Sequence, residues 1–228
     1  MALKIGTGLT IGGGITIAGT LGPVIPGLIL YLDASDPTSY PGTGTTWYDL
    51  SSAGNNATLT GDTPWTSDGS QSYFTFNAGF ADAGYVLPNT TYTKVVMFRV
   101  AGDYSNIISG NNAGSQHAFW GFGGQYLQSG HNGAWSTVES PVLTPLNQWV
   151  FGAVSFSNVT GWELYLNNET AVTNLNTDQF ADNPAVLEVG AFDGGNNLGG
   201  DVAAVLIYNR VLTAVEIARN FAYFNSRF

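Results

Sequence analysis

The chain has 228 residues, a formal net charge of −10 and only 10% charged residues, where an ordinary soluble domain carries roughly 25%. This composition excludes long surface helices held by Glu–Lys pairs, and the 30 glycines favour the strands and turns of an all-β protein. The six cations form no basic stripe and cysteine is absent, which argues against nucleic acid and anionic membranes as partners and excludes disulfides and thiolate metal sites.

Residues 1–26 are predicted to form a glycine-rich arm. Two copies of a short repeat, at 8–12 and 14–19, alternate aliphatic residues with threonine, which is the period of a strand with one apolar face. Exposed aliphatic strands need cover, so the arm is predicted to add strands to a partner or to self-associate; a flexible tail or a plain edge strand is the alternative. The residues expected to anchor the arm are Leu9, Ile11, Ile15 and Ile17.

Residues 27–228 are predicted to form one β-sandwich domain. The apolar run at 27–32 is too short for a transmembrane helix, so no membrane insertion is expected. About eleven short strands separated by turn clusters indicate a sandwich or jelly roll instead of βαβ units. The predicted strands are 28–33, 57–60, 73–76, 93–100, 105–109, 116–122, 125–129, 149–156, 162–167, 186–192 and 201–208.

One helix is predicted at the C-terminus. Thr213 and Glu216 have the spacing of a capping box, in which each side chain bonds the backbone N–H of the other residue. Ile217, Phe221 and Phe224 follow at spacings of four and three, which places them on one apolar stripe. The helix is therefore expected to pack on the sandwich.

Several segments taken together resemble the laminin-G-like, concanavalin A-like jelly-roll domains. They are the strand at 27–33 with the W-x-D-x-S stretch of Trp47, Asp49 and Ser51, the paired strands 149–154 and 162–167, and the closing strand 200–213 with its helix. The resemblance implies a concanavalin A-like jelly-roll sandwich with one C-terminal helix, preceded here by the extended arm.

The glycine repeat and the segment 129–135 also resemble virion structural proteins of tailed phages, including those that infect marine bacteria. This resemblance implies a virion surface protein that decorates the capsid or belongs to the tail or a fibre. Other virion proteins would hold it through residues 1–26. The N-terminus is too broken by glycine for a signal-peptide core, so folding in the host cytoplasm is expected.

Glycoside hydrolysis on such a fold needs two carboxylates roughly 5–10 Å apart. No predicted strand carries an alternating acid motif, and the glutamates are isolated along the sequence. The protein is therefore predicted not to be an enzyme. The alternatives are a glycan-active hydrolase or lyase on the same fold, or a bacterial cell-surface adhesion module.

No cofactor is required by these patterns, although a structural calcium ion is one hypothesis. Many laminin-G-like domains hold calcium through Asp, Asn and backbone carbonyls, and the resemblance makes Asp193, Asn196 and Asp201 the candidate ligands. A second candidate set is Asp49 with Asn55 and Asn56. The alternative interpretation is a tight turn in which Asp193 bonds nearby amides.

The segment 117–135 is the richest local collection of aromatic and amide side chains, which suit the apolar face and the hydroxyls of a sugar. It is the candidate site for a host-surface glycan. Alternation along the strand places Phe119 and Trp120 on opposite faces, so if Phe119 lines the core, Trp120 is freer. Some of these rings are alternatively needed for the core. The candidate contacts are His117, Trp120, Gln125, Tyr126, His131, Asn132 and Trp135.

Overall fold

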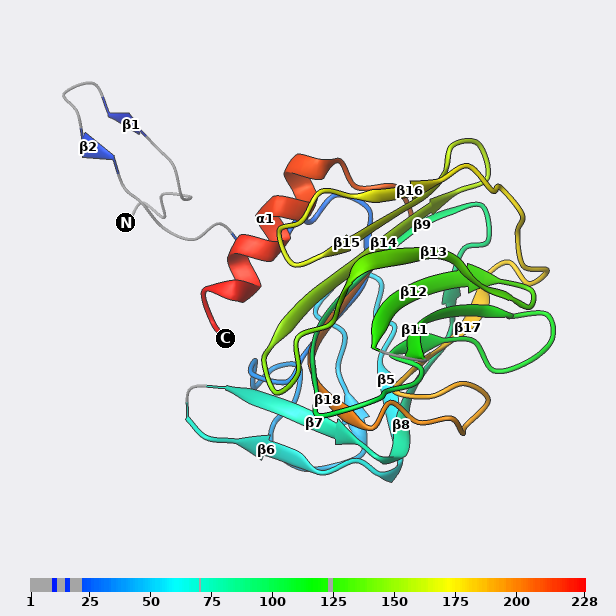
Figure 1. Cartoon of the computed structure of the whole chain (residues 1–228). Coiled ribbons are helices and arrows are strands. Elements are labelled where there is room, and N and C mark those ends of the chain that lie inside the picture. Colours follow the sequence, from blue (N-terminus) through cyan, green and yellow to red (C-terminus); the bar gives the residue numbers. More distant parts are fainter. Residues whose placement is uncertain (1–9, 12–14, 17–21, 70, 123–124) are drawn as a thin grey trace.

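Two facing β-layers and one helix make up the fold (Figure 1). The structure is a computed structural model, and it describes residues 10–11, 15–16, 22–69, 71–122 and 125–228. The predicted all-β sandwich with a C-terminal helix is confirmed. The elements are β1 (Thr10–Ile11), β2 (Ile15–Thr16), β3 (Leu28–Asp33), β4 (Thr46–Trp47), β5 (Ala57–Asp62), β6 (Trp65–Ser67), β7 (Ser72–Phe76), β8 (Ala78–Leu87), β9 (Thr91–Val100), β10 (Ile108–Ser109), β11 (His117–Phe122), β12 (Tyr126–His131), β13 (Ala134–Leu143), β14 (Val150–Ser157), β15 (Gly161–Leu166), β16 (Val172–Asn174), β17 (Ala185–Val189), β18 (Gly200–Tyr208) and α1 (Ala214–Asn225).

The larger layer is an eight-stranded sheet in the order β16-β15-β14-β9-β18-β7-β6, with β3 also paired to β18. Along β9, Val96 and Phe98 belong to the core between the layers, whereas Val95 and Met97 belong to a second apolar cluster that includes residues of α1. Both faces of this sheet are therefore covered. This explains why β9, β14 and β18 are continuous apolar runs in the sequence instead of alternating ones.

The opposite layer consists of a five-stranded sheet, β10-β17-β8-β5-β4, and a three-stranded sheet, β11-β12-β13. Backbone hydrogen bonds join the two sheets: Ile107 N–H donates to the Phe119 carbonyl at 2.9 Å, and Gly110 N–H donates to the His117 carbonyl at 3.0 Å. Phe119 and Leu127 point from this layer into the shared core. β11, β12 and β13 thereby form one end of the layer that faces away from α1.

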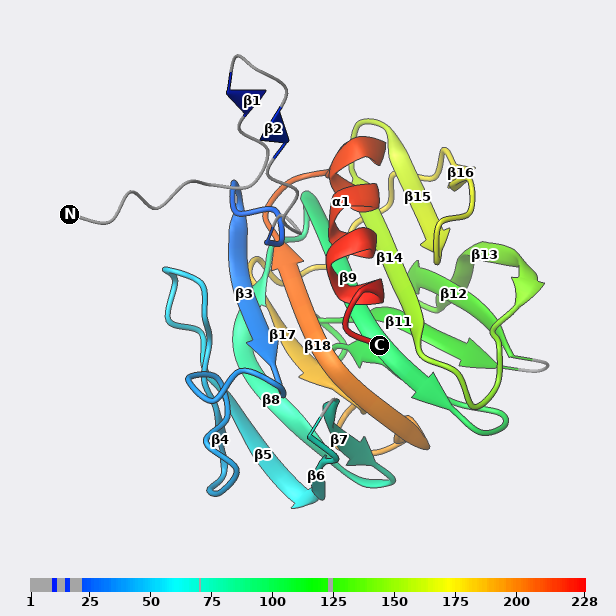
Figure 2. The ribbon, with the colours of Figure 1, turned by 90° about the vertical axis from the view of Figure 1, so that its left-hand side faces the viewer.

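Helix α1 begins with the predicted capping box. The Thr213 hydroxyl accepts from the Glu216 N–H at 3.3 Å, and the Glu216 carboxylate accepts from the Thr213 N–H at 2.9 Å. Ile217 and Phe224 are buried, and Phe221 packs beside them against the eight-stranded sheet. The helix lies across the outer face of that sheet (Figure 2). Helix α1, the helix in the described part of the chain, is not long and apolar enough to cross a membrane.

The predicted arm is described only in part. Ile11 and Ile15 are paired residues of the antiparallel strands β1 and β2, whereas Leu9 and Ile17 lie outside the described residues. Val24 is buried, and its N–H donates to Asn220 of α1 at 2.8 Å. The packed domain therefore begins before the predicted boundary at residue 27.

Candidate glycan-binding site

Trp120 of β11 and Trp135 of β13 lie together at the surface of the three-stranded sheet. The Trp120 indole N–H donates to the Trp135 carbonyl oxygen at 2.8 Å, which fixes the position of one ring relative to the other strand. The Trp135 ring meets the Phe192 ring edge-on, with 5.7 Å between ring centroids. A pocket of about 280 Å³ opens beside these rings, lined by Ser105, Asn106, Ala118, Trp120, Trp135, Phe192 and Asn196.

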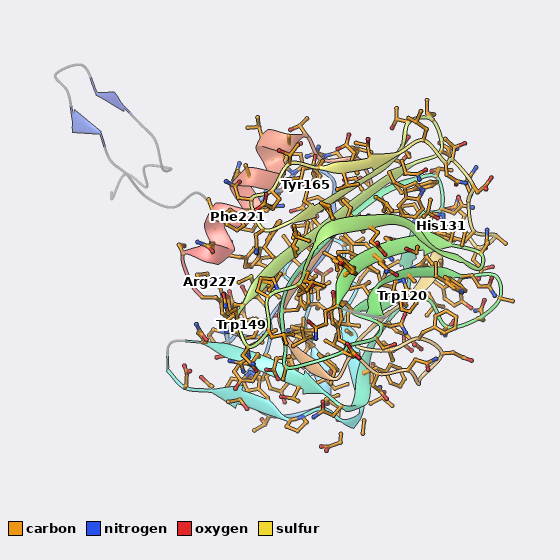
Figure 3. All side chains as sticks on the ribbon, viewed as in Figure 1. Trp120, His131, Trp149, Tyr165, Phe221 and Arg227 are labelled. Atoms are coloured by element: carbon orange, nitrogen blue, oxygen red, sulfur yellow. The ribbon has the colours of Figure 1, made fainter. Side chains whose placement is uncertain are left out.

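A second and more open hollow of about 520 Å³ adjoins the first because it shares both tryptophans. Its lining residues are Trp120, Gln128, Gly133, Ala134, Trp135 and Ser136. We call the two hollows together the tryptophan groove. It lies on the side of the sandwich away from α1, as the labelled positions of Trp120 and Phe221 show (Figure 3).

Amide groups form one wall of the groove in a fixed arrangement. The Asn106 side-chain amide donates to the Asn196 carbonyl at 3.2 Å and accepts from the Ser109 hydroxyl at 2.7 Å. Asn106 also forms an isolated antiparallel bridge with Trp120, which explains how a loop residue comes to stand beside a residue of β11. A wall held in this way loses little conformational entropy when a ligand binds.

A tight turn brings Phe192 and Asn196 to the groove. Phe192 and Gly195 form a two-bond bridge, and the residues between them, Asp193 and Gly194, both have positive φ angles, 53° and 64°. Two consecutive positive φ angles define a type I′ turn, and Asp-Gly is a preferred sequence for it. The turn interpretation of this segment is therefore the one that the structure supports.

Asp201, one of the three candidate calcium ligands, has other bonding partners in the structure. Both carboxylate oxygens of Asp201 are engaged, one by the Thr75 hydroxyl at 2.7 Å and the other by Arg99, with 2.7 Å as its shortest contact. Asp193 and Asn196 belong to the turn segment beside Phe192. Throughout the described part of the chain, no cluster of three or more His, Asp or Glu side chains could hold a metal ion.

The prediction that His117 and His131 contact a glycan is wrong, because both rings are buried in the sandwich. The His131 ring nitrogens lie 2.8 Å from the Asp178 carbonyl and 2.8 Å from the Tyr92 hydroxyl. Since a carbonyl can only accept, Nδ1 carries the proton and Nε2 accepts from Tyr92. Burial lowers the pKa of His131 to about 3, so the ring is neutral.

Sequence reasoning missed the fully buried Lys94 as the partner of His117. Lys94 Nζ lies 2.7 Å from His117 Nδ1 and 3.2 Å from the Ile108 carbonyl. His117 Nε2 lies 3.0 Å from the Val186 carbonyl, so it carries the ring proton and Nδ1 accepts from Lys94. Burial lowers the pKa of both Lys94 and His117. The available signal was a lysine inside the apolar run of β9.

The remaining predicted contacts are not among the residues that line the groove. Gln125 has a positive φ of 73° and its carbonyl accepts from the Thr144 N–H at 2.9 Å. Tyr126 is half-buried at the start of β12. Asn132 is exposed, and its side-chain amide donates to the Gln179 carbonyl at 2.5 Å. Of the predicted set, Trp120 and Trp135 are the residues that the structure brings together.

The two facing β-layers with one helix at the C-terminus place this chain among the jelly-roll sandwich domains. Residues 68–218 match the laminin-G-like family described as the concanavalin A-like lectin/glucanases superfamily, and the chain belongs to this family. A search of curated protein sequences finds no match.

Several solved structures with similar folds contain a bound sugar or sugar analogue. The Trypanosoma rangeli sialidase in complex with 2,3-difluorosialic acid has a TM-score of 0.67 and 15% identity, over 90% of this chain and 34% of the sialidase. Domain 4 of the Geobacillus stearothermophilus arabinanase AbnA in complex with arabinotriose has a TM-score of 0.60 and 16% identity, over 86% of this chain and 98% of the arabinanase domain. The binding domain of botulinum neurotoxin DC in complex with SialylT has a TM-score of 0.63 and 12% identity, over 90% of this chain and 52% of the neurotoxin chain. This chain spans about a third of the length of the sialidase chains.

The prediction that the protein is not an enzyme is contradicted by these fold matches. They include sialidase chains, one a mutant displaying trans-sialidase activity and one captured as a covalent intermediate. The lack of an alternating acid motif within one strand therefore excludes no activity, because carboxylates from separate strands can form the pair that glycan chemistry needs.

Proposed function

We propose that this domain binds glycans in the tryptophan groove. The observation that carries the proposal is the pair formed by Trp120 and Trp135 beside the fixed amide wall of Asn106. Aromatic faces pack against the apolar side of a sugar ring, and amides and hydroxyls bond its hydroxyl groups. The arabinotriose and SialylT complexes of similarly folded domains support this proposal.

Hydrogen bonding fixes both sides of the groove before a ligand arrives. The Trp120 indole is bonded to the backbone of β13, and Asn106 is bonded to Ser109 and to the Asn196 carbonyl. Asn196 itself and Ser136 are exposed at the surface of the two hollows. These two side chains are therefore accessible to sugar hydroxyls, while the tryptophans supply the apolar platform.

Glycan-array binding by the purified chain, followed by calorimetry with the best ligand and with arabinotriose, tests this function. Trp120→Ala and Trp135→Ala should each weaken binding roughly tenfold, because an aromatic contact contributes about 0.5–1.5 kcal/mol beyond its buried area. Trp149→Ala is the matched control, since that half-buried ring packs near the C-terminus against Phe228. Thermal melts establish that each variant is folded. Failure of the array to reveal a ligand, or an affinity in both groove variants that is unchanged from that of the unsubstituted protein, would refute the proposal.

We also propose that residues 1–21 attach this domain to other virion proteins, at the surface of a phage particle. The glycine repeat and the pairing of Ile11 with Ile15 support an arm that uses strands. Because Val24 is packed on α1, deletion should stop at residue 21 to leave the domain intact. The truncated protein is expected to fold and to be missing from particles in mass spectrometry. Normal incorporation would refute the attachment.

A further inference from the structure

We infer that the tryptophan groove selects uncharged glycans and discriminates against sialylated and uronic-acid glycans. This inference rests on the proposed glycan function and specifies its ligand class. Recognition of a sugar carboxylate normally uses an Arg or Lys side chain, which pairs with it directly. Neither hollow of the groove, as the structure describes it, has an Arg or Lys among its lining residues.

The cationic side chains that the structure describes bond to groups outside the groove. Lys94 is buried beside His117, and Arg219 donates to the backbone carbonyls of Gly22 and Pro23. The other three form ion pairs, which are Arg99 with Asp201, Arg210 with Glu216 and Arg227 with Asp33. A carboxylate ligand in the groove would therefore find no partner cation among these side chains without breaking an existing contact.

An acidic group, Glu139, lies next to the second hollow. The Glu139 carboxylate accepts from Gln128 and, at 3.4 Å, from Ser136, and both of these partners line the second hollow. With Glu139 beside the second hollow and a net charge of −10 on the whole chain, an anionic sugar meets repulsion at the groove.

The ligands named for the fold neighbours differ in charge, and the groove of this chain suits one kind better than the other. Sialic acid carries a carboxylate, whereas arabinotriose is uncharged. The groove of this chain offers amides, hydroxyls and aromatic faces, which suit the second kind of ligand. Shared fold therefore does not imply shared ligand charge, because the fold neighbours are less than 20% identical to this chain.

The test compares matched glycan pairs on the full chain by calorimetry. One pair is lactose with sialyllactose, another is the methyl ester of trigalacturonic acid with the free acid, and arabinotriose is an added neutral probe. The neutral member of each pair should bind at least tenfold more tightly. Ser136→Lys places a cation in the second hollow and should reduce this preference several-fold, whereas Thr160→Lys, an exposed position outside the groove, should not.

The outcomes distinguish failure of the charge preference from failure of the glycan function. Equal or tighter binding of the acidic sugars, abolished by Trp120→Ala, would overturn the charge preference and leave the glycan function in place. An unchanged preference in Ser136→Lys would also overturn the electrostatic explanation. Absence of binding to every probe and to the glycan array would refute the glycan function, and the charge preference with it.

Discussion

Replacing His131 with phenylalanine should make the stability of this protein less sensitive to acid. The His131 ring lies among the rings of Phe156, Trp162 and Phe180, with centroid distances of 4.6, 4.4 and 4.9 Å. Burial lowers its pKa in the folded state to about 3, whereas an exposed histidine has a pKa of about 6.5. The folded state therefore holds the neutral ring, and protons bind preferentially to the unfolded chain.

The size of the effect follows from this difference. The contribution of neutral His131 to stability is fully present above pH 6.5 and is lost as the pH falls from 6.5 toward 3. At pH 5 the loss amounts to about 2 kcal/mol, since each pH unit below 6.5 costs about 1.4 kcal/mol. The lowered pKa of His117 acts in the same direction, so the complete protein loses more than the share of His131 alone.

Urea unfolding at pH 7.5 and pH 5.0 measures the effect. The drop in unfolding free energy between the two pH values should be about 2 kcal/mol smaller in His131→Phe than in the unsubstituted protein. Tyr92→Phe is the control, because it removes the hydroxyl bonded to His131 and keeps the titrating ring. An identical drop in His131→Phe and the unsubstituted protein would show that the buried ring does not control acid stability.

Three further substitutions test how the elements are held. Thr213→Ala removes the capping box of α1 and should lower the unfolding free energy by about 1 kcal/mol in urea titrations. Asp33→Asn weakens the pairing with Arg227 at 2.6 Å, in which the aspartate is buried, and should cost about 3 kcal/mol; a melting temperature unchanged from that of the original protein would contradict this. Gly190 has a left-handed φ of 86°, and in Gly190→Ala the added Cβ would lie 2.6 Å from the Phe76 ring. Because alanine disfavours this backbone conformation and the contact is too short, a marked drop in melting temperature or in soluble yield is expected.

The strands that the sequence missed show the limit of local patterns. Strand β8 contains Gly79, Asp82 and Gly84, which are poor strand formers and indicate a turn when read alone. It forms because β5 and β17 pair with it on its two sides. Strand β13 contains Pro141, which is tolerated because β13 lies at the edge of its sheet.

Alternation along β11 predicts the faces of four consecutive residues, two of which line the groove. Phe119 is in the core and Trp120 is at the surface, as alternation predicts. The same rule places His117 on the face of Phe119, which is where the structure has it, and Ala118 on the face of Trp120, beside the pocket. Burial of His117 was therefore predictable from the strand register alone.

The sequence by itself determined properties that depend on neighbours in the chain. These are the all-β class, the capped helix α1, the turn at Asp193 and Gly194, and the face of β11 that carries Trp120. Long-range pairing alone decided the groove. It needs β13 to be in register with β12, and the loops at 105–106 and 192–196 to reach the same end of the sandwich. No local pattern encodes such contacts, because their energy comes from burial and hydrogen bonding between segments far apart in the chain. The same applies to charge: composition predicted a protein poor in cations, and only the folded structure placed the described ones away from the tryptophan groove.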